Sequence, residues 1–223
     1  MLRWYWFRIT VLFLFSLFNL VVAADTETQA HEHQGKLIAY TGAPPGIYLD
    51  DDELALLEDG QALFKKIQLD KAKRGIAVFR VNADSATIWS VIKDFSSYPE
   101  WINDIEAIDV YKQEQGMSYV KFTAGGLFGS KTVWYAVHDY PDSTRDWGTW
   151  RLDYTHRSDL DDAVGFWRVI PVAGKSNQSD VIYSADLKLK GFFTSLFETA
   201  LIDSSLRDAT EWVKVQAEAR VVK

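Results

Sequence analysis

Apolar and polar residues alternate in seven segments of the second two-thirds of the chain, and a period of two predicts β-strands. The first segment is residues 75–83, which is also rich in β-branched side chains. The other six follow after a gap, separated by short turns, at residues 105–113, 117–124, 131–140, 147–156, 163–172 and 180–189. Such close connections favour an antiparallel meander.

Helical periodicity appears in three places. Residues 86–94 follow a capping Asp84 or Ser85 and are apolar on one face, and residues 51–59 form a shorter helix that ends at Gly60. Residues 193–221 form a long helix whose apolar stripe is Ile202, Leu206, Ala209, Val213 and Ala217. Residues 62–69, between the short helix and the first alternating segment, are expected to be a strand or an extended arm.

The order of these elements predicts an α+β fold. A single antiparallel sheet must bury its apolar face against another layer, and only the C-terminal helix is long enough to cover it. The prediction is a curved seven-stranded antiparallel sheet around this helix. The space between the two is filled either by aromatic side chains or by a ligand.

Residues 1–24 have the pattern of a secretory signal peptide. Arg3 and Arg8 precede an apolar run, residues 9–22, which ends in small residues. The alternative is an uncleaved signal anchor, with Trp4 and Trp6 at a membrane interface. The expected organisation is therefore a signal peptide or anchor at 1–24, a flexible tether (residues 25–35), short helix and N-terminal arm within 25–74, and the main domain at 75–223. The protein is expected to be exported, periplasmic or secreted, and anchored if the segment is not cleaved.

Charge and composition narrow the function. The chain has 24 Lys and Arg and 31 Asp and Glu; without Arg3 and Arg8 the basic count is 22, and the net charge is 22 − 31 = −9. A domain this acidic is a poor nucleic-acid binder, because that binding rests on phosphate neutralisation. The chain has no cysteine, which excludes disulfides, thiol catalysis and thiolate zinc sites.

The connection "DFSSYPEWINDI", residues 94–105, is unusually aromatic for a segment that should lie on the surface. Together with the helix before it and the order of elements, it resembles the START-like superfamily SRPBCC. This superfamily includes polyketide cyclase/dehydrase-like proteins, coenzyme Q-binding proteins, lipid-transfer START domains and plant allergens. Two family patterns match, at Asp94, Tyr98, Pro99 and Trp101, and at Gly165, Trp167, Val169 and Pro171.

The resemblance covers about residues 75–223 and implies a helix-grip fold with an apolar cavity. In that fold, Phe95 and Trp101 are expected to seal one end, Pro99 to fix the turn, and Asp94 to cap or hydrogen-bond the local backbone. Strand alternation places Trp150, Leu152 and Tyr154 on one face, with Arg151 and Arg168 outward. The candidate lining residues are Phe95, Tyr98, Trp101, Trp150, Tyr154, Trp167, Tyr183, Phe197 and Leu201.

Other chemistry-bearing residues are weaker candidates. His31 and His33 are a poor metal pair, because no third ligand is fixed nearby, so neither a metal nor a cofactor is expected. The acidic residues Asp159, Asp161 and Asp162 are expected in a solvated turn. The glycine-rich stretch 125–130 joins two strands rather than a strand and a helix, which favours a hairpin loop or a flap over a phosphate site.

The residues and the resemblance together favour a monomeric binding protein that holds a lipid, quinone or polyketide-like molecule without catalysis. Its partner would be a hydrophobic small molecule, with membrane proximity only through the N-terminal segment. One alternative is a cyclase or dehydratase that uses one acid or base, with candidates His138, His156, Tyr154 and Asp153. Another is an envelope interaction module with a closed cavity, contacting partners through residues 125–128 and the N-terminal arm.

Overall fold

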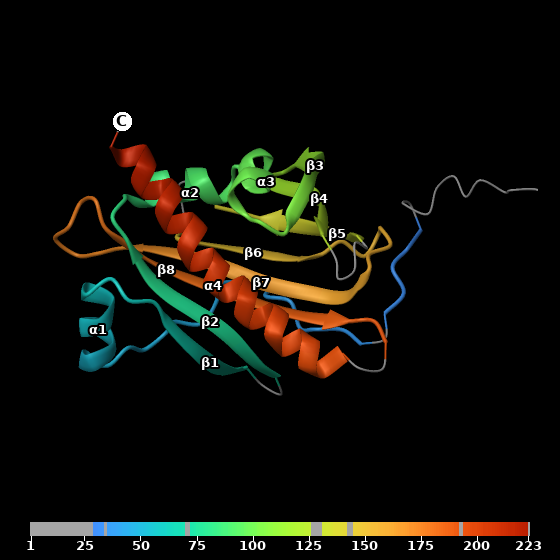
Figure 1. The fold of residues 1–223 in the computed structure, drawn as a ribbon, viewed down its shortest axis with the longest axis horizontal. Helices are drawn as coiled ribbons and strands as arrows, with labels where there is room; N and C mark the ends of the chain where they lie inside the picture. Colours follow the sequence, from blue (N-terminus) through green and yellow to red (C-terminus); the bar gives the residue numbers. More distant parts are fainter. Residues whose placement is uncertain are drawn as a thin grey trace, which may run out of the picture.

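The computed structural model describes residues 29–33, 35–69, 72–125, 131–141, 145–191 and 194–222, and only the backbone at 67–69, 72–73 and 194–197 (Figure 1). The expected signal peptide and most of the glycine-rich loop lie outside these residues. No helix in the described ranges combines the length and the apolar character needed to cross a membrane. The helical elements are α1 (Asp51–Glu58), α2 (Ser85–Ile92), the 3-10 turn η1 (Phe95–Ser97), α3 (Tyr98–Trp101) and α4 (Thr194–Val221).

The strands form one antiparallel sheet in the order β1-β2-β8-β7-β6-β5-β4-β3. The α+β fold and the meander are confirmed, but the sheet has eight described strands rather than seven, because residues 62–69 pair with β2 along its free edge. The strand bounds are β1 (Leu63–Leu69), β2 (Ala72–Val81), β3 (Ile105–Glu114), β4 (Met117–Gly125), β5 (Lys131–Asp139), β6 (Trp147–Leu152), β7 (Leu160–Pro171) and β8 (Ser179–Leu189).

Helix α4 lies diagonally across one face of the sheet, which we call the concave face (Figure 1). Its expected stripe is confirmed: Leu206, Ala209, Val213 and Ala217 are buried in the core, and Ile202 is half-buried against it. Gly75 in β2 permits the close approach, since a β-carbon there would lie 2.9 Å from the Leu206 Cδ1 atom. Burial of the stripe, rather than helix propensity, holds α4 in place.

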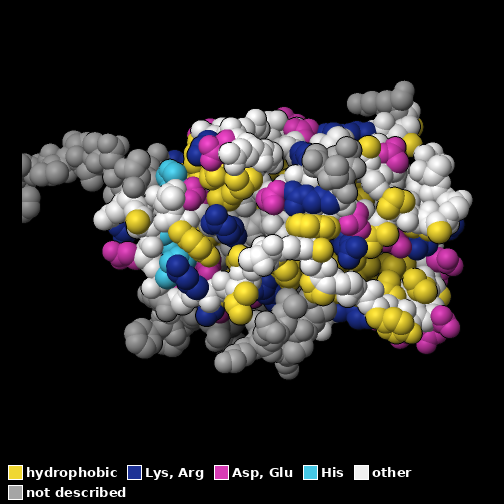
Figure 2. Space-filling model, turned by 180° about the vertical axis from the view of Figure 1, so that it is seen from behind, with side chains coloured by type: hydrophobic (Ala, Val, Ile, Leu, Met, Phe, Trp, Pro, Cys, Tyr) yellow, Lys and Arg dark blue, Asp and Glu magenta, His cyan; other side chains and the backbone are white. Residues whose placement is uncertain are grey.

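The opposite, convex face is covered by the N-terminal segment and α1. A second buried cluster lies there, and half-buried side chains of the N-terminal segment pack against it; its buried members are Leu57, Leu63, Ile76, Val78, Phe166 and Ile182. The ring of Tyr40 meets that of Phe166 edge-on, with 4.9 Å between centroids. Figure 2 shows the molecule from the side opposite α4, with apolar side chains among charged ones.

The expected tether differs from the structure between residues 31 and 35. His31 is 8% exposed, and the backbone N–H groups of Gly35 and Leu37 donate to the carboxylates of Asp161 and Asp162 at 2.7 and 2.6 Å. Asp161 and Asp162 are 2% and 0% exposed, so the expectation that they lie in a solvated turn is wrong. The backbone donors compensate the buried charges, and the folded unit therefore starts well before residue 75.

Candidate ligand-binding site on the concave face

The connection after α2 packs onto the concave face. Asp84 caps α2 by accepting the Thr87 N–H at 2.7 Å. After α2, Phe95 at the start of η1 and Tyr98 at the start of α3 are buried. The Tyr98 hydroxyl donates to the Ile92 carbonyl at 2.6 Å, which fixes its ring. The aromatic residues of this connection therefore belong to the core.

Asp94 does not cap the local backbone as expected. Its carboxylate accepts from the Ser96 hydroxyl at 2.9 Å and from Nη2 of Arg220, in the last turn of α4, at 2.7 Å. Burial alone would raise the pKa of Asp94, but these hydrogen bonds and the guanidinium charge outweigh it, and the pKa is lowered. The ion pair joins the connection to the C-terminal end of α4.

A chain of aromatic rings fills the concave face under the C-terminal half of α4. Trp167 stacks on Tyr183 with 4.0 Å between centroids, and Trp212 of α4 lies 6.0 Å from Trp167. Trp212 also contacts Tyr98 and Trp101, at 4.9 and 6.1 Å. Offset and edge-on contacts of this kind add to the burial of the rings. This half of the expected space is thus packed by the protein's own side chains.

Next to these rings, some apolar side chains of the concave face are only half-buried. They come from three strands and the helix, and we call them the apolar rim: Trp134, Trp150, Leu187, Leu189 and Ile202. Trp150 lies over Gly165, its partner in the ladder, where a β-carbon would lie 2.4 Å from the ring. The rim is thus one part of the concave face where apolar side chains of the described residues remain partly accessible.

His138 is the polar group at the centre of the rings. It is buried among Phe95, Phe122 and Trp150, with centroid distances of 4.8, 5.7 and 6.3 Å. Its Nδ1 atom and the Tyr140 hydroxyl are 2.8 Å apart, whereas its Nε2 atom has no hydrogen-bond partner among the described residues. Burial lowers the pKa of His138 to about 3, so the imidazole is neutral at physiological pH.

The nine predicted lining residues divide into four groups. Phe95, Tyr98, Trp167 and Tyr183 are buried in the concave core, and Trp101 and Trp150 pack against it half-exposed. Tyr154 and Leu201 lie outside this core. The side chain of Phe197 is outside the described part of the chain.

Tyr154 and Leu201 are the two that do not reach the concave core. Strand β6 ends at Leu152, so the alternation stops before Tyr154, whose ring packs on His33 and whose hydroxyl donates to Asp162 at 3.1 Å. Leu201 is 46% exposed, because it precedes Ile202 on α4 and points off the apolar stripe. Tyr154 instead packs at the edge of the apolar rim, against the same buried cluster as Trp150 and Leu187. The side chain of Leu201 points to solvent.

Four residues that were not among the predicted candidates also lie here: Phe122, Trp134, Tyr140 and Trp212. His138, named in the sequence only as a possible acid or base, joins them. The alternation of this strand puts Trp134, Ala136 and His138 on one face, but does not tell which face of the sheet it is. The pairing of Trp134 with Phe122 and of His138 with Trp150 settles this, since ladder partners share a face.

Other acid–base candidates lie off the concave face. Asp153 accepts from the Tyr111 hydroxyl at 2.5 Å and contacts the His156 Nδ1 atom at 3.0 Å, and His156 stacks on Tyr135 of the convex face. Burial alone would raise the pKa of Asp153, but hydrogen bonds from Tyr111 and Thr155 outweigh it and lower the pKa. Of the four predicted catalytic candidates, only His138 lies among the rings of the concave face.

Comparisons with known proteins agree with this arrangement. The ZhuI aromatase/cyclase from Streptomyces sp. R1128 superposes with a TM-score of 0.57 at 16% identity, covering 71% of this chain and 96% of its own. A STAR-related lipid transfer protein from Xanthomonas axonopodis (fragment 25–204) gives 0.56 at 14% identity, covering 70% and 93%. A START superfamily protein from Mycobacterium smegmatis gives 0.52 at 16%, covering 66% and 95%. At these identities the likeness concerns the fold alone.

No curated protein sequence matches the chain significantly. The family model described as polyketide cyclase/dehydrase and lipid transport, however, matches residues 81–211. These residues run from the end of β2 to the middle of α4, more than half of the chain, and include both sequence patterns and every ring of the cluster except Trp212. The protein belongs to the polyketide cyclase/dehydrase and lipid transport family.

Proposed function

We propose that the protein is an exported, monomeric binding protein that holds a hydrophobic small molecule, such as a lipid, quinone or polyketide-like compound, without catalysis. The observation that carries this proposal is the apolar rim. Two indole rings and three aliphatic side chains stay half-exposed beside a packed aromatic core. A ligand seated against the rim would remove this apolar surface from water.

His138 offers such a ligand one polar anchor. Its Nε2 atom is buried and lacks a partner among the described residues, and an unmade hydrogen bond of this kind costs about 1–3 kcal/mol. A hydroxyl or carbonyl group on an otherwise apolar molecule would satisfy it. The neutral imidazole suits an uncharged group better than an acidic one.

The absence of catalysis is supported by the same residue. A general base works best when its pKa lies near the operating pH, whereas burial lowers the pKa of His138 to about 3. The tyrosine that contacts it is a weak acid too, since burial raises the pKa of Tyr140 well above its usual value. The cyclase or dehydratase alternative requires His138 to transfer a proton from this environment.

Export is supported by the N-terminal pattern, with Arg3 and Arg8 before an apolar run and small residues at its end. N-terminal sequencing of the protein from its own host tests this part. A mature chain that starts near residue 25 in the exported fraction is the expected result. A chain that starts at Met1 in a membrane fraction would identify an anchor instead.

Ligand content tests the main proposal. Native mass spectrometry of protein purified from its host should show an added mass that organic extraction releases. In titrations followed by tryptophan fluorescence, that extract should bind wild type and the Leu201→Asp variant alike, but bind Ile202→Asp more weakly. The two positions are adjacent on α4, and only Ile202 faces the rim. If the native protein carries no apolar molecule and takes up none, the closed interaction module is favoured.

A further inference from the structure

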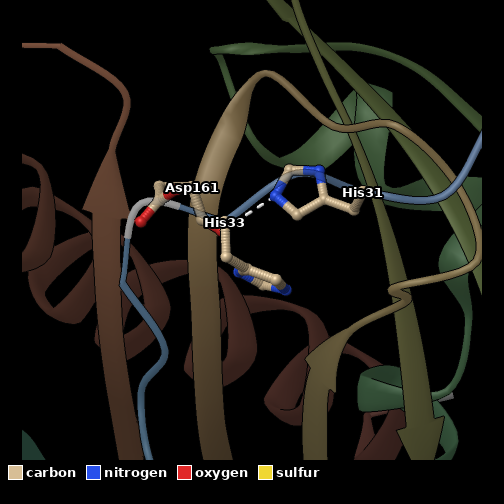
Figure 3. A group of neighbouring side chains, drawn as sticks. All are labelled: His31, His33 and Asp161. Carbon is tan, nitrogen blue, oxygen red and sulfur yellow. Dashed lines mark hydrogen bonds between the residues drawn. The ribbon is translucent and has the colours of Figure 1, made fainter.

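Three side chains that can bind a metal meet at the start of β7, away from the ring cluster. His31 and His33 come from the N-terminal segment, and Asp161 is the second residue of β7, 128 positions after His33 (161 − 33). One ligand atom of each lies within 4.8 Å of the others (Figure 3). The third ligand that His31 and His33 lack in the sequence is supplied by the fold.

His33 is the member of the group whose ring nitrogens lack hydrogen-bond partners within the described ranges. Both of these nitrogens are buried. The ring lies edge-on to His31 and to Tyr154, with centroid distances of 4.6 and 4.5 Å. A buried imidazole without a partner loses its hydrogen bonds to water and gains none. A metal ion would use one of these nitrogens.

His31 is already held for coordination. Its Nδ1 atom accepts the Ser158 N–H at 3.1 Å, and its Nε2 atom donates to the Asp161 carbonyl at 2.8 Å (dashed in Figure 3). Backbone carbonyls orient metal-binding imidazoles in this way. Coordination replaces one of the two hydrogen bonds.

We propose that His31, His33 and Asp161 bind one divalent transition-metal ion of the Zn²⁺ type, with water as a fourth ligand. Two imidazoles and a carboxylate are a donor set that Zn²⁺ accepts, with bonds of about 2.0–2.2 Å. Ligand atoms around such an ion lie about 3.3–3.5 Å apart, so the side chains close in from their present separation of up to 4.8 Å.

The ion would fasten the N-terminal segment to the start of β7. Gly35 and Leu37 already donate to Asp161 and Asp162 there, so the metal adds to an existing attachment. The metal-bound segment therefore resists cleavage and detachment more than the metal-free one. The site is separate from the concave face, and its occupancy is independent of the proposed apolar ligand.

The test is a Zn²⁺ titration of the full mature protein after treatment with a chelator. Calorimetry should show one equivalent bound, and Co²⁺ in its place should give the visible absorption of a tetrahedral nitrogen and oxygen site. His33→Ala and Asp161→Asn should each weaken binding by at least about tenfold. The Asn side chain keeps an acceptor for the Gly35 N–H, so this variant separates coordination from folding.

His156→Gln is the matched control, because this histidine also contacts a carboxylate but lies outside the group. It should bind Zn²⁺ like wild type. Limited proteolysis gives a second measure: Zn²⁺ should slow cleavage between residues 29 and 37 in wild type and in His156→Gln, but not in His33→Ala. Equal Zn²⁺ affinity in wild type, His33→Ala and Asp161→Asn, or no binding to any of them, would overturn the proposal.

Discussion

At the scale of single residues, the second sequence pattern has a steric reason. A β-carbon on Gly165 would lie 2.2 Å from the Ser184 carbonyl oxygen and 2.4 Å from the Trp150 ring. Glycine at this position lets the indole lie flat over the neighbouring strand. Gly165 therefore leaves the space that Trp150 occupies in the apolar rim.

Gly165→Ala should destabilise the protein by about 1–3 kcal/mol, the usual cost of overpacking. It should also move Trp150 and change the tryptophan emission spectrum. Urea unfolding followed by circular dichroism measures the first effect. Gly46→Ala is the control, since a β-carbon there meets no atom within 4 Å. If both variants unfold at the same urea concentration, the contact over Gly165 is not a constraint.

His138 predicts a pH dependence of stability. The unfolded chain binds a proton at this residue below about pH 6.5, whereas the folded protein, in which burial lowers the pKa of His138 to about 3, does not. The free energy of unfolding should therefore fall as the pH is lowered between these values, by about 1.4 kcal/mol per pH unit from this group.

His138→Phe removes this contribution, so the stability difference between variant and wild type should grow in favour of the variant as the pH falls from 6.5. Chemical unfolding at several pH values measures it. Parallel stability curves for the two proteins would show that His138 takes up its proton equally in both states.

At the scale of elements, the N-terminal segment and α1 serve as a layer of the fold. They bury the convex side of β2, β7 and β8, a face that the sequence pattern left open to solvent. Phe166 is fully buried there although it points away from α4. This part of the sheet is thus covered on both sides.

Phe166→Ala should cost about 3–5 kcal/mol, as large-to-small changes in a core do. Phe64→Ala is the control, because that side chain is 47% exposed and should matter far less. Urea unfolding of both variants measures the contrast. A small effect at Phe166 would mean that the N-terminal segment leaves this face accessible in solution.

At the scale of the whole molecule, the sequence predicted what depends on periodicity and missed what depends on polar contacts. The meander and α4 follow from alternation and the helical stripe. The packing of residues 31–37 does not, because it rests on backbone donors that meet the buried Asp161 and Asp162. The position of Tyr154 does not follow either, because no apolar pattern marks the end of β6.

The candidate site could be predicted in part for the same reason. Aromatic residues on strands identified Trp167, Tyr183 and Trp150. Which face of the sheet His138 occupies depends on how β5 pairs with β4 and β6. The sequence of β5 alone does not contain this information. The metal-ligating group joins two distant segments and was invisible without the fold.

The pairing of β2 with β8 has a consequence for folding kinetics. Every other described pair joins strands that follow one another in the chain. This pair joins residues from 98 positions apart, Val81 and Ser179, to 110 apart, Gly75 and Ala185. Closing so long a loop costs chain entropy before it gains contacts, so we expect this step to limit the folding rate. Stopped-flow experiments should find that Val181→Ala slows refolding, whereas Val120→Ala in the local β3–β4 hairpin mainly speeds unfolding.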